Sequence, residues 1–421
     1  MKKSITINNL IINIYLIFML LYVYASATGI SDKIIIIITF FTMVFLGIQT
    51  RYISIEFGER LWILASIVMI IWTHRIKPEV VYYNIIFLLT ILCLIVLQSS
   101  RIVIKLDKFL TIFLGMATAT VVLVISELIL QSKISGFLGL FLPSEALADE
   151  LLYINAGTGL RGLASSTNAV SLAAFILLAY LLYSYKKDNF LLKIAGLVFG
   201  IVALVVCGER SNFIFAPLAL VFVYIVQTNN NKVIKYFKAL LIIMCILSIL
   251  VILKPQLEEI PALKRTFRTL QLLQKGDEIA GERSILYERA IEMWREKPLL
   301  GHGWFEFYYT NTGILKAGSN SHAHNLLYES LSELGIIGTV MLFIPIIYAI
   351  LENIRLLNYS KTLVNGETHK GILCFVLAVQ LFFILDSMLH LTFFSPRIIL
   401  YLMSQFILFY EKRKLRNLYE L

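Results

Sequence analysis

The chain has 421 residues, of which 59% are apolar or aromatic and only 15% are charged. Its mean hydropathy is +0.81, whereas about a quarter of the residues in soluble domains are charged. This composition excludes a soluble enzyme, a disordered chain and a secreted disulfide scaffold. The formal net charge of +10 does not indicate nucleic acid as a partner, because in a membrane chain the position of basic residues matters more than their sum.

Twelve apolar runs are candidates to cross a bilayer, which takes about 20 helical residues. Several of them need flanking polar residues to reach that length. They lie near residues 10–24, 34–48, 61–72, 80–97, 109–130, 169–183, 192–207, 213–226, 239–253, 336–351, 372–385 and 398–409. We find no paired broken helices of the kind that marks many transporters. The pattern predicts an all-α polytopic membrane protein with residues 1–421 in a single integral membrane domain.

The basic residues are distributed unevenly between alternate loops. With the amino terminus inside, most of them fall in inner loops, and the short outer loops hold only Lys33, Arg75, Lys77, Lys133, Arg161, Arg210 and Arg397. The positive-inside rule therefore predicts that both termini are cytoplasmic. The Ala25-Ser26-Ala27 sequence after the first run resembles a signal-peptidase site, so cleavage of the first span stays open.

Two predicted outer segments, residues 131–168 and 254–325, are too long to be simple connections. Long ordered loops are usually functional. In the second segment, apolar residues recur at helical spacing between Ser284 and Trp294, which predicts an amphipathic helix along the membrane surface. We expect this helix to end at Lys297-Pro298, before a tight bend at Gly301-His302-Gly303.

Three arginines lie near predicted membrane boundaries on the outer side: Arg161, Arg210 and Arg283. An arginine at the edge of hydrocarbon usually has an anionic partner, and its guanidinium group matches phosphate oxygens well. The alternative for each is a snorkelling anchor, or an ion pair with a carboxylate such as Glu209 or Glu282. Three arginines on one side of the membrane favour an anionic ligand.

The histidines His302, His322 and His324 all lie in the second outer segment, and Asn325 follows immediately before an apolar helix. A neutral imidazole can accept a proton from a hydroxyl near neutral pH. The alternative is a helix-capping segment closed by Asn325 or Ser321. A zinc site is not indicated, because no HExxH motif is present and the spacing of His322 and His324 does not place both rings on one helical face.

Carboxylates follow on the same predicted helix, where four-residue spacing stacks Glu329 and Glu333 with Asn325. Either carboxylate is placed to orient a histidine or to pair with a loop arginine. Asp386 is a lone charge within a predicted span, and His390 follows one turn later. Charge within a span usually has a function, but a helix-packing hydrogen bond explains this pair equally well.

Taken together, these motifs resemble the bacterial O-antigen ligase and O-antigen polymerase family. The resemblance rests on their order over the carboxy-terminal two thirds of the chain: Arg161 to Asn168, Gly208-Glu209-Arg210-Ser211, Gly281 to Gly303, and His322 to Gly335. Glu209 departs from the pattern, because family members often have a small or hydroxyl residue before the arginine.

The resemblance implies a GT-C-type membrane glycosyltransferase that needs no metal or other cofactor and inverts the anomeric carbon. It implies transfer of a glycan from undecaprenyl diphosphate to an acceptor sugar hydroxyl at the periplasmic face of the bacterial inner membrane. By position, Arg161, Arg210 and Arg283 would bind the diphosphate and His324 would be the general base, with His322 as a less certain catalytic partner. The possible orienting residues are Asn325, Glu329 and Glu333.

Three functions stay open at this stage. A ligase would use the lipid A core as acceptor in lipopolysaccharide assembly, whereas a polymerase would join lipid-linked repeats into an O-antigen, capsule or exopolysaccharide. A flippase or transporter of lipid-linked saccharides is a more distant alternative, since it would need polar residues along a path through the membrane. The aromatic residues of the second loop would stack on sugars or rest on lipid: Trp304, Phe305, Phe307, Tyr308 and Tyr309.

Overall fold

The computed structural model describes residues 2–50, 52–99, 106–184, 190–228, 282–311, 321–363 and 366–419. These residues form helices and loops, with no strand among them. The amino-terminal helices are α1 (Lys2–Tyr24), η1 (Ser26–Thr28), α2 (Asp32–Ile48), α3 (Phe57–Ile71), α4 (Pro78–Ser99), α5 (Leu106–Leu130), η2 (Gln131–Ile134), α6 (Ser135–Leu138) and α7 (Ser144–Ala156). The remaining helices are α8 (Thr167–Tyr183), α9 (Phe190–Val206), α10 (Asn212–Gln227), α14 (Glu282–Glu296), α15 (Glu306–Thr310), α16 (Leu326–Ser360), α17 (Glu367–Ser387) and α18 (Ile398–Tyr419).

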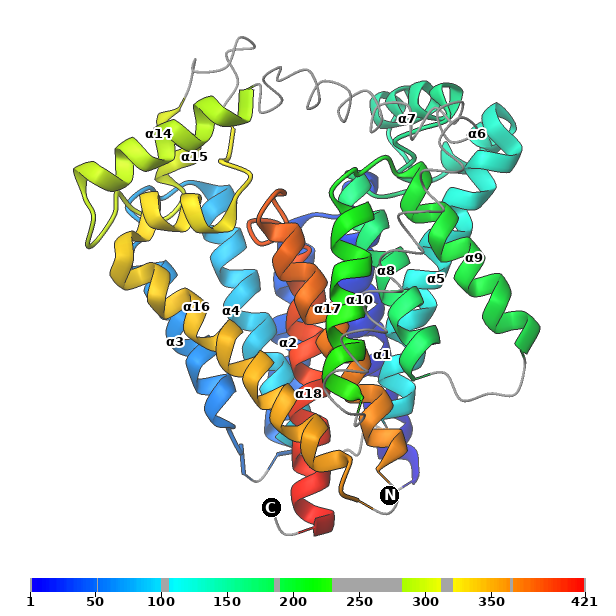
Figure 1. Cartoon of the computed structure of the whole chain (residues 1–421), viewed down its shortest axis with the longest axis vertical. Helices are drawn as coiled ribbons and strands as arrows, with labels where there is room; N and C mark the ends of the chain where they lie inside the picture. Colours follow the sequence, from blue (N-terminus) through cyan, green and yellow to red (C-terminus); the bar gives the residue numbers. More distant parts are fainter. Residues whose placement is uncertain are drawn as a thin grey trace.

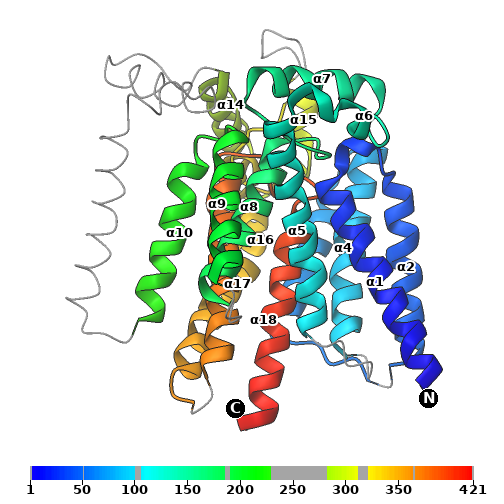
Figure 2. The same cartoon turned by 90° about the vertical axis from the view of Figure 1, so that its right-hand side faces the viewer.

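The long helices form one bundle, with α6, α7, α14 and α15 at one end (Figure 1). We call this the site end. The start of α1 and the end of α18 both lie at the opposite end, as Figure 2 also shows. Eleven of the twelve predicted runs fall within these helices, and the run at 239–253 lies outside the described residues.

The centre of the bundle is formed by helices that are apolar on all sides. Nearly every residue of α8 is buried, and the rings of Phe175 in α8 and Phe382 in α17 stack with centroids 4.0 Å apart. Helices at the periphery instead expose large apolar side chains, such as Phe41, Ile201 and Ile214. A soluble protein rarely exposes apolar surface of this extent, so these faces are suited to lipid.

Four described segments are long and apolar enough to cross a bilayer: Pro78–Ser99, Leu106–Leu138, Leu326–Ser360 and Glu367–Ser387. Shorter apolar helices accompany them at Asn9–Tyr24, Thr167–Tyr183, Phe190–Val206 and Asn212–Gln227. Over the residues that the structure describes, the fold is that of a helical, multi-pass membrane protein. A total of twelve spans stays a prediction.

The surface helix predicted around residues 284–294 is confirmed as α14. Its apolar face does not lie on lipid, because Leu286, Ala290 and Met293 are buried in a small cluster with Phe307 and Ala323. Apolar residues at helical spacing between Ser284 and Trp294 predicted the helix, but the sequence did not show that protein covers its apolar face. The helix therefore forms a wall of the site end.

At the opposite end, the last helix is fixed by ion pairs. Lys412 of α18 lies 2.9 Å from Glu352 of α16 and 3.2 Å from Glu56. Arg413 pairs with Glu59 at 3.1 Å, and Arg416 pairs with Glu56 at 2.9 Å. Because several partly buried charges share partners, this network holds α18 more firmly than an isolated surface pair would.

Candidate active site

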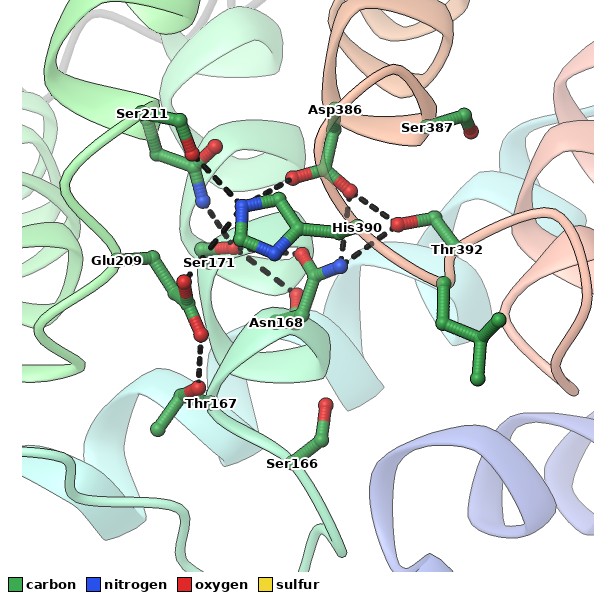
Figure 3. A network of polar contacts seen from close by, with 12 residues as sticks. Ser166, Thr167, Asn168, Ser171, Glu209, Ser211, Asp386, Ser387, His390 and Thr392 are labelled. Carbon is green, nitrogen blue, oxygen red and sulfur yellow. Dashed lines mark hydrogen bonds and ion pairs between the residues drawn. The ribbon is translucent and has the colours of Figure 1, made fainter. Parts of the chain in front are cut away.

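Three segments that are far apart in the sequence meet at the site end through a buried polar network (Figure 3). Asn168, at the start of α8, donates from Nδ2 to Asp386 Oδ2 at 2.9 Å and to Thr392 Oγ1 at 2.6 Å. Asn212 of α10 donates to Ser171 Oγ at 2.7 Å. Buried polar groups need such partners, so the network fixes α8, α10 and the segment after α17 relative to one another.

His390 joins the turn at residues 208–211 to this network (Figure 3). Its Nε2 lies 2.7 Å from Ser211 Oγ, 3.5 Å from Glu209 Oε2 and 3.8 Å from Asp386 Oδ1. The hydroxyl of Thr167 donates to the other oxygen of Glu209. Asp386 and His390 thus make the packing contacts that the sequence offered as one alternative, and they bring two predicted motifs together.

The predicted arginine at position 161 has a carboxylate partner. Its Nε lies 2.8 Å from Glu150 Oε2, its backbone N–H donates to Oε1 at 2.8 Å, and its guanidinium carbon lies 4.3 Å from the centroid of the Tyr153 ring. Burial raises the pKa of Glu150, and the hydrogen bonds and charge of Arg161 oppose that shift. The ion pair expected as the alternative therefore exists, with Glu150 as the partner.

Arg210 and Arg283 lie on separate elements of the site end. Arg210 is half-buried in the turn beside Ser211, which the polar network holds. Arg283 is exposed in the first turn of α14.

A fourth arginine, Arg397, was not predicted as a site residue. Its Nε donates to Ser395 Oγ at 2.8 Å, one terminal nitrogen donates to the Leu391 carbonyl at 3.1 Å, and the other donates to the Ser166 hydroxyl. All three acceptors are neutral. Burial lowers the pKa of Arg397, while the charges of Asp386 and Glu209 raise it. In the sequence it is only an arginine before the last apolar run, which is typical of a boundary anchor.

His324 is the point at which these charges converge. Burial is the largest cause that lowers the pKa of His324 to about 4, and the positive charges of Arg283 and Arg397 act in the same direction. The imidazole is therefore neutral at pH 7. Its backbone is left-handed, with φ of 54°, an uncommon conformation for a residue other than glycine and one that often marks functional sites.

His322 is held by the carboxylate of Glu329. Its Nδ1 hydrogen-bonds to Glu329 Oε1, and the Ala323 N–H donates to Oε2 at 3.0 Å. The rings of Tyr308 and Phe394 stack on His322, with centroids 4.7 and 5.7 Å away. A carboxylate only accepts, so Nδ1 carries a proton, and in the neutral imidazole Nε2 is then an acceptor. The predicted orienting role of Glu329 thus has a partner, which is His322.

The other two predicted orienting residues have structural partners. Asn325 caps α16 by accepting from the N–H groups of Leu327 and Tyr328 at 3.0 Å, and its Nδ2 donates to the Met388 carbonyl at 2.9 Å. Glu333 is fully buried and accepts from the Phe307 N–H at 3.2 Å. Asn325 therefore confirms the capping interpretation, and Glu333 supports the loop before α15.

A close backbone crossing positions that loop against α16. The N–H groups of His302 and Gly303 donate to the carbonyls of Ser332 and Glu333 at 3.0 and 2.8 Å. Gly335 has φ of 63° and ψ of −171°, which breaks α16 into two segments. A Cβ on Gly335 would lie 2.4 Å from the Leu299 carbonyl group. Only glycine fits this crossing.

The loop aromatics do not all serve the same purpose. Trp304 and Phe307 are fully buried in protein, so they contact neither lipid nor solvent. Tyr308 stacks on His322, and the Tyr309 hydroxyl donates to Glu79 Oε1 at 2.6 Å. Among the described residues, no three His, Cys, Asp or Glu side chains come together as a possible metal site.

Residues 195–343 match the family described as O-antigen ligase. The chain carries an O-antigen ligase family domain. This match confirms the predicted resemblance, and the domain contains Arg210, Arg283, His322, His324 and Glu329. Members of the family are glycosyltransferase-like membrane enzymes. Arg161 and Arg397 lie outside the O-antigen ligase domain and reach the site through the fold. No curated protein matches the chain.

Proposed function

We propose that the protein is a membrane glycosyltransferase that moves a glycan from undecaprenyl diphosphate to an acceptor sugar hydroxyl. The observation that carries this proposal is the set of cationic groups around a neutral His324, which itself lies within the O-antigen ligase domain. A lipid diphosphate leaving group is an anion that these cationic groups would attract. A neutral imidazole beside it supplies the proton acceptor.

The donor diphosphate would bind between Arg283 and Arg397. Arg283 is exposed and free to approach from the solvent side, and Arg397 has only neutral hydrogen-bond partners. A guanidinium group forms paired hydrogen bonds with phosphate oxygens, and fixed positive charge stabilises the charge that develops on the leaving group. Arg210 would extend this surface. Arg161 would bind the diphosphate with the terminal nitrogens that its Nε pairing with Glu150 leaves unused.

The reaction would proceed by direct displacement. The acceptor oxygen attacks the anomeric carbon, the bond from that carbon to the diphosphate breaks, and the electron pair leaves with undecaprenyl diphosphate. The hydroxyl proton passes to His324, the general base. A base with a pKa of about 4 is weak in the empty site, but a bound diphosphate cancels the surrounding positive charge and strengthens it. Donor binding would thereby activate the base.

The cellular setting is part of the same proposal. The site end would face the periplasm and both termini the cytoplasm, in agreement with the distribution of basic residues. The reaction would be inverting and independent of metal, on a GT-C-like scaffold with residues 254–325 and 131–168 as outer loops. A ligase acting in lipopolysaccharide assembly would use the lipid A core as acceptor, and a polymerase would use a second lipid-linked repeat.

The test uses the purified full-length protein in lipid nanodiscs with an undecaprenyl diphosphate-linked repeat, with and without lipid A core. Four proteins are compared: wild type, His324→Ala, Arg283→Ala and Arg289→Ala. Arg289 is the matched control, because it lies on the same helix and pairs with Glu292 at 3.2 Å instead of facing the site. We expect loss of a catalytic base to slow transfer by about 10²- to 10⁴-fold.

The outcomes separate the alternatives. A product that forms only with lipid A core identifies a ligase, and extension of the lipid-linked repeat by itself identifies a polymerase. Arg283→Ala should weaken donor binding while Arg289→Ala behaves as wild type. Undiminished transfer by His324→Ala would refute the assigned base, and transport of the lipid-linked repeat without glycosidic bond formation would refute transfer altogether.

A further inference from the structure

A cavity of about 420 Å³ lies beside His322. Its walls come from α1, α2 and α4, from the loop and short helix that carry Phe305 and Tyr308, and from residues 391–399. The volume falls in the range of about 300–1,000 Å³ that is usual for small-molecule sites. Most of the walls lie outside the O-antigen ligase domain at 195–343, so the cavity belongs mainly to other parts of this chain.

The cavity is lined by aromatic and aliphatic side chains together with two carboxylates. Tyr83, Phe305, Tyr308 and Phe394 present aromatic surface, Asp32 and Glu79 present the carboxylates, and five aliphatic residues also line the cavity. Flat aromatic rings pack against the C–H face of a sugar, while carboxylates accept hydrogen bonds from its hydroxyl groups. An acyl chain would desolvate the half-buried Asp32 without offering its carboxylate a hydrogen bond, whereas Glu79 is exposed at the rim.

The carboxylates are only partly satisfied within the protein. Tyr22 donates its hydroxyl to Asp32 Oδ1 at 2.6 Å, and Tyr309 donates to Glu79 Oε1 at 2.6 Å. The described residues that line the cavity include no lysine or arginine. Nearby Arg75 is engaged with Glu306 at 2.7 Å. Among the described residues that line the cavity, the charged side chains are therefore carboxylates, while Lys77 and Arg75 lie next to Glu79 and Tyr309 outside the lining.

Two short segments connect the cavity to the donor site. In residues 321–325, His322 lines the cavity and His324 faces the cationic groups. In the segment after α17, Phe394 lines the cavity, and the charge of Arg397 lowers the pKa of His324. The i, i+2 spacing of the histidines, which places their rings on different sides, therefore serves two adjoining subsites. His322 in its neutral form offers Nε2 as an acceptor, because Nδ1 is bonded to Glu329 while the rings of Tyr308 and Phe394 stack on the imidazole.

We propose that this cavity is the acceptor subsite and that it selects a neutral or amino-bearing sugar ring over an acidic one. His322 Nε2 accepts a hydrogen bond from a sugar hydroxyl, and the Tyr308 ring packs along the sugar. Asp32 and Glu79 repel a uronic acid or a phosphorylated sugar. This inference rests on the proposed function, because the bound sugar is an acceptor only if transfer takes place, but the binding test does not require transfer.

The test measures saturation-transfer NMR signals from three methyl glycosides with the wild-type protein in nanodiscs: glucoside, glucosaminide and glucuronide. They share one ring and carry a neutral, a cationic and an anionic group. We expect the glucoside and the glucosaminide to bind and the glucuronide to bind several-fold more weakly. Tyr308→Leu should weaken glucoside binding about 3- to 10-fold, in line with the usual contribution of one aromatic contact. The double substitution Asp32→Asn with Glu79→Gln should admit the glucuronide.

Tyr52→Leu is the matched control, because Tyr52 is 85% exposed and lies between α2 and α3, away from the cavity. This variant should bind the three glycosides as the wild type does. Thermal unfolding of each variant identifies misfolded protein, and the comparison of three glycosides in the wild type needs no variant. Equal binding of glucuronide and glucoside by the wild type, or displacement of the glucoside by a spin-labelled fatty acid, would overturn the proposal. Selective binding without transfer would refute the proposed function alone, and transfer without selectivity would refute this inference alone.

Discussion

Replacing Gly335 with alanine tests how far the site depends on the backbone crossing at α16. The residue has φ of 63° and ψ of −171°, a region that is open essentially only to glycine and costs other residues about 1–3 kcal/mol. The added methyl group would also lie 2.4 Å from the Leu299 carbonyl group and 2.5 Å from Leu300 N. These contacts are backbone atoms, so no side chain can move aside to relieve them.

The clash is relieved only if the backbone around Leu299 moves away from the backbone around Gly335. That would break some of the hydrogen bonds across the crossing, among them those from the N–H groups of Ile336 and Ile337 to the carbonyls of Pro298 and Leu299 at 2.9 and 3.2 Å. Each such bond contributes about 0.5–1.5 kcal/mol. With the backbone strain added, we expect a loss of about 3 kcal/mol or more, and displacement of the loop that carries Tyr308.

The assay is thermal unfolding in nanodiscs together with the transfer reaction. Gly115→Ala is the matched control, because Gly115 lies within α5 and a Cβ there meets nothing within 4 Å. In a helix interior, alanine is favoured over glycine by up to about 1 kcal/mol, so this variant should be as stable as wild type or slightly more so. A Gly335→Ala protein with wild-type stability and activity would show that the crossing is not needed.

Three further predictions concern charge. The pKa of His324 is about 4 in the folded protein, against an ordinary value of 6.5. Because the unfolded chain therefore binds a proton at this residue more readily, the free energy of unfolding falls by roughly 3 kcal/mol as the pH drops from 6.5 to 4. Thermal unfolding of wild type should therefore decline more steeply with acid than that of His324→Gln, and equal declines would contradict this. Arg397→Ala should lower donor affinity at least tenfold while Arg397→Lys keeps part of it, measured by binding of labelled undecaprenyl diphosphate; equal affinity in all three would remove Arg397 from the donor site. Glu329→Gln should reverse the tautomer of His322 and raise the KM for the acceptor more than it lowers kcat. An unchanged KM would show that His322 does not bind the acceptor.

The fold followed from the sequence where one physical signal dominated. Apolar runs gave eleven of the described helices because burial in lipid or in the bundle requires such runs, and apolar residues at helical spacing between Ser284 and Trp294 gave α14. The break at Gly335 was not foreseen, because helical periodicity continues through it. Its reason is a contact with Leu299, 36 residues earlier in the chain, and no local pattern reports such a contact.

The candidate site was predictable in its residue types more than in its pairings. The sequence singled out His322, His324 and Glu329, but it could not show that the carboxylate holds His322. Arg397 was missed because an arginine before an apolar run usually anchors a helix at the membrane boundary. Its importance depends on α8 and α17, which bring Ser166 and Asp386 close to it.

The ion pairs at the far end of α18 have a consequence for the chemistry. The helix begins at Ile398, directly after Arg397, and runs without interruption to the segment that contains Lys412, Arg413 and Arg416. A straight helix transmits rotation and translation along its length, at about 1.5 Å per residue. Loosening the salt bridges with Glu56 and Glu352 would therefore allow the whole helix to turn or slide, and Arg397 would move with it at the site end. A change at one end of the bundle would in this way reach the donor site that we propose at the other.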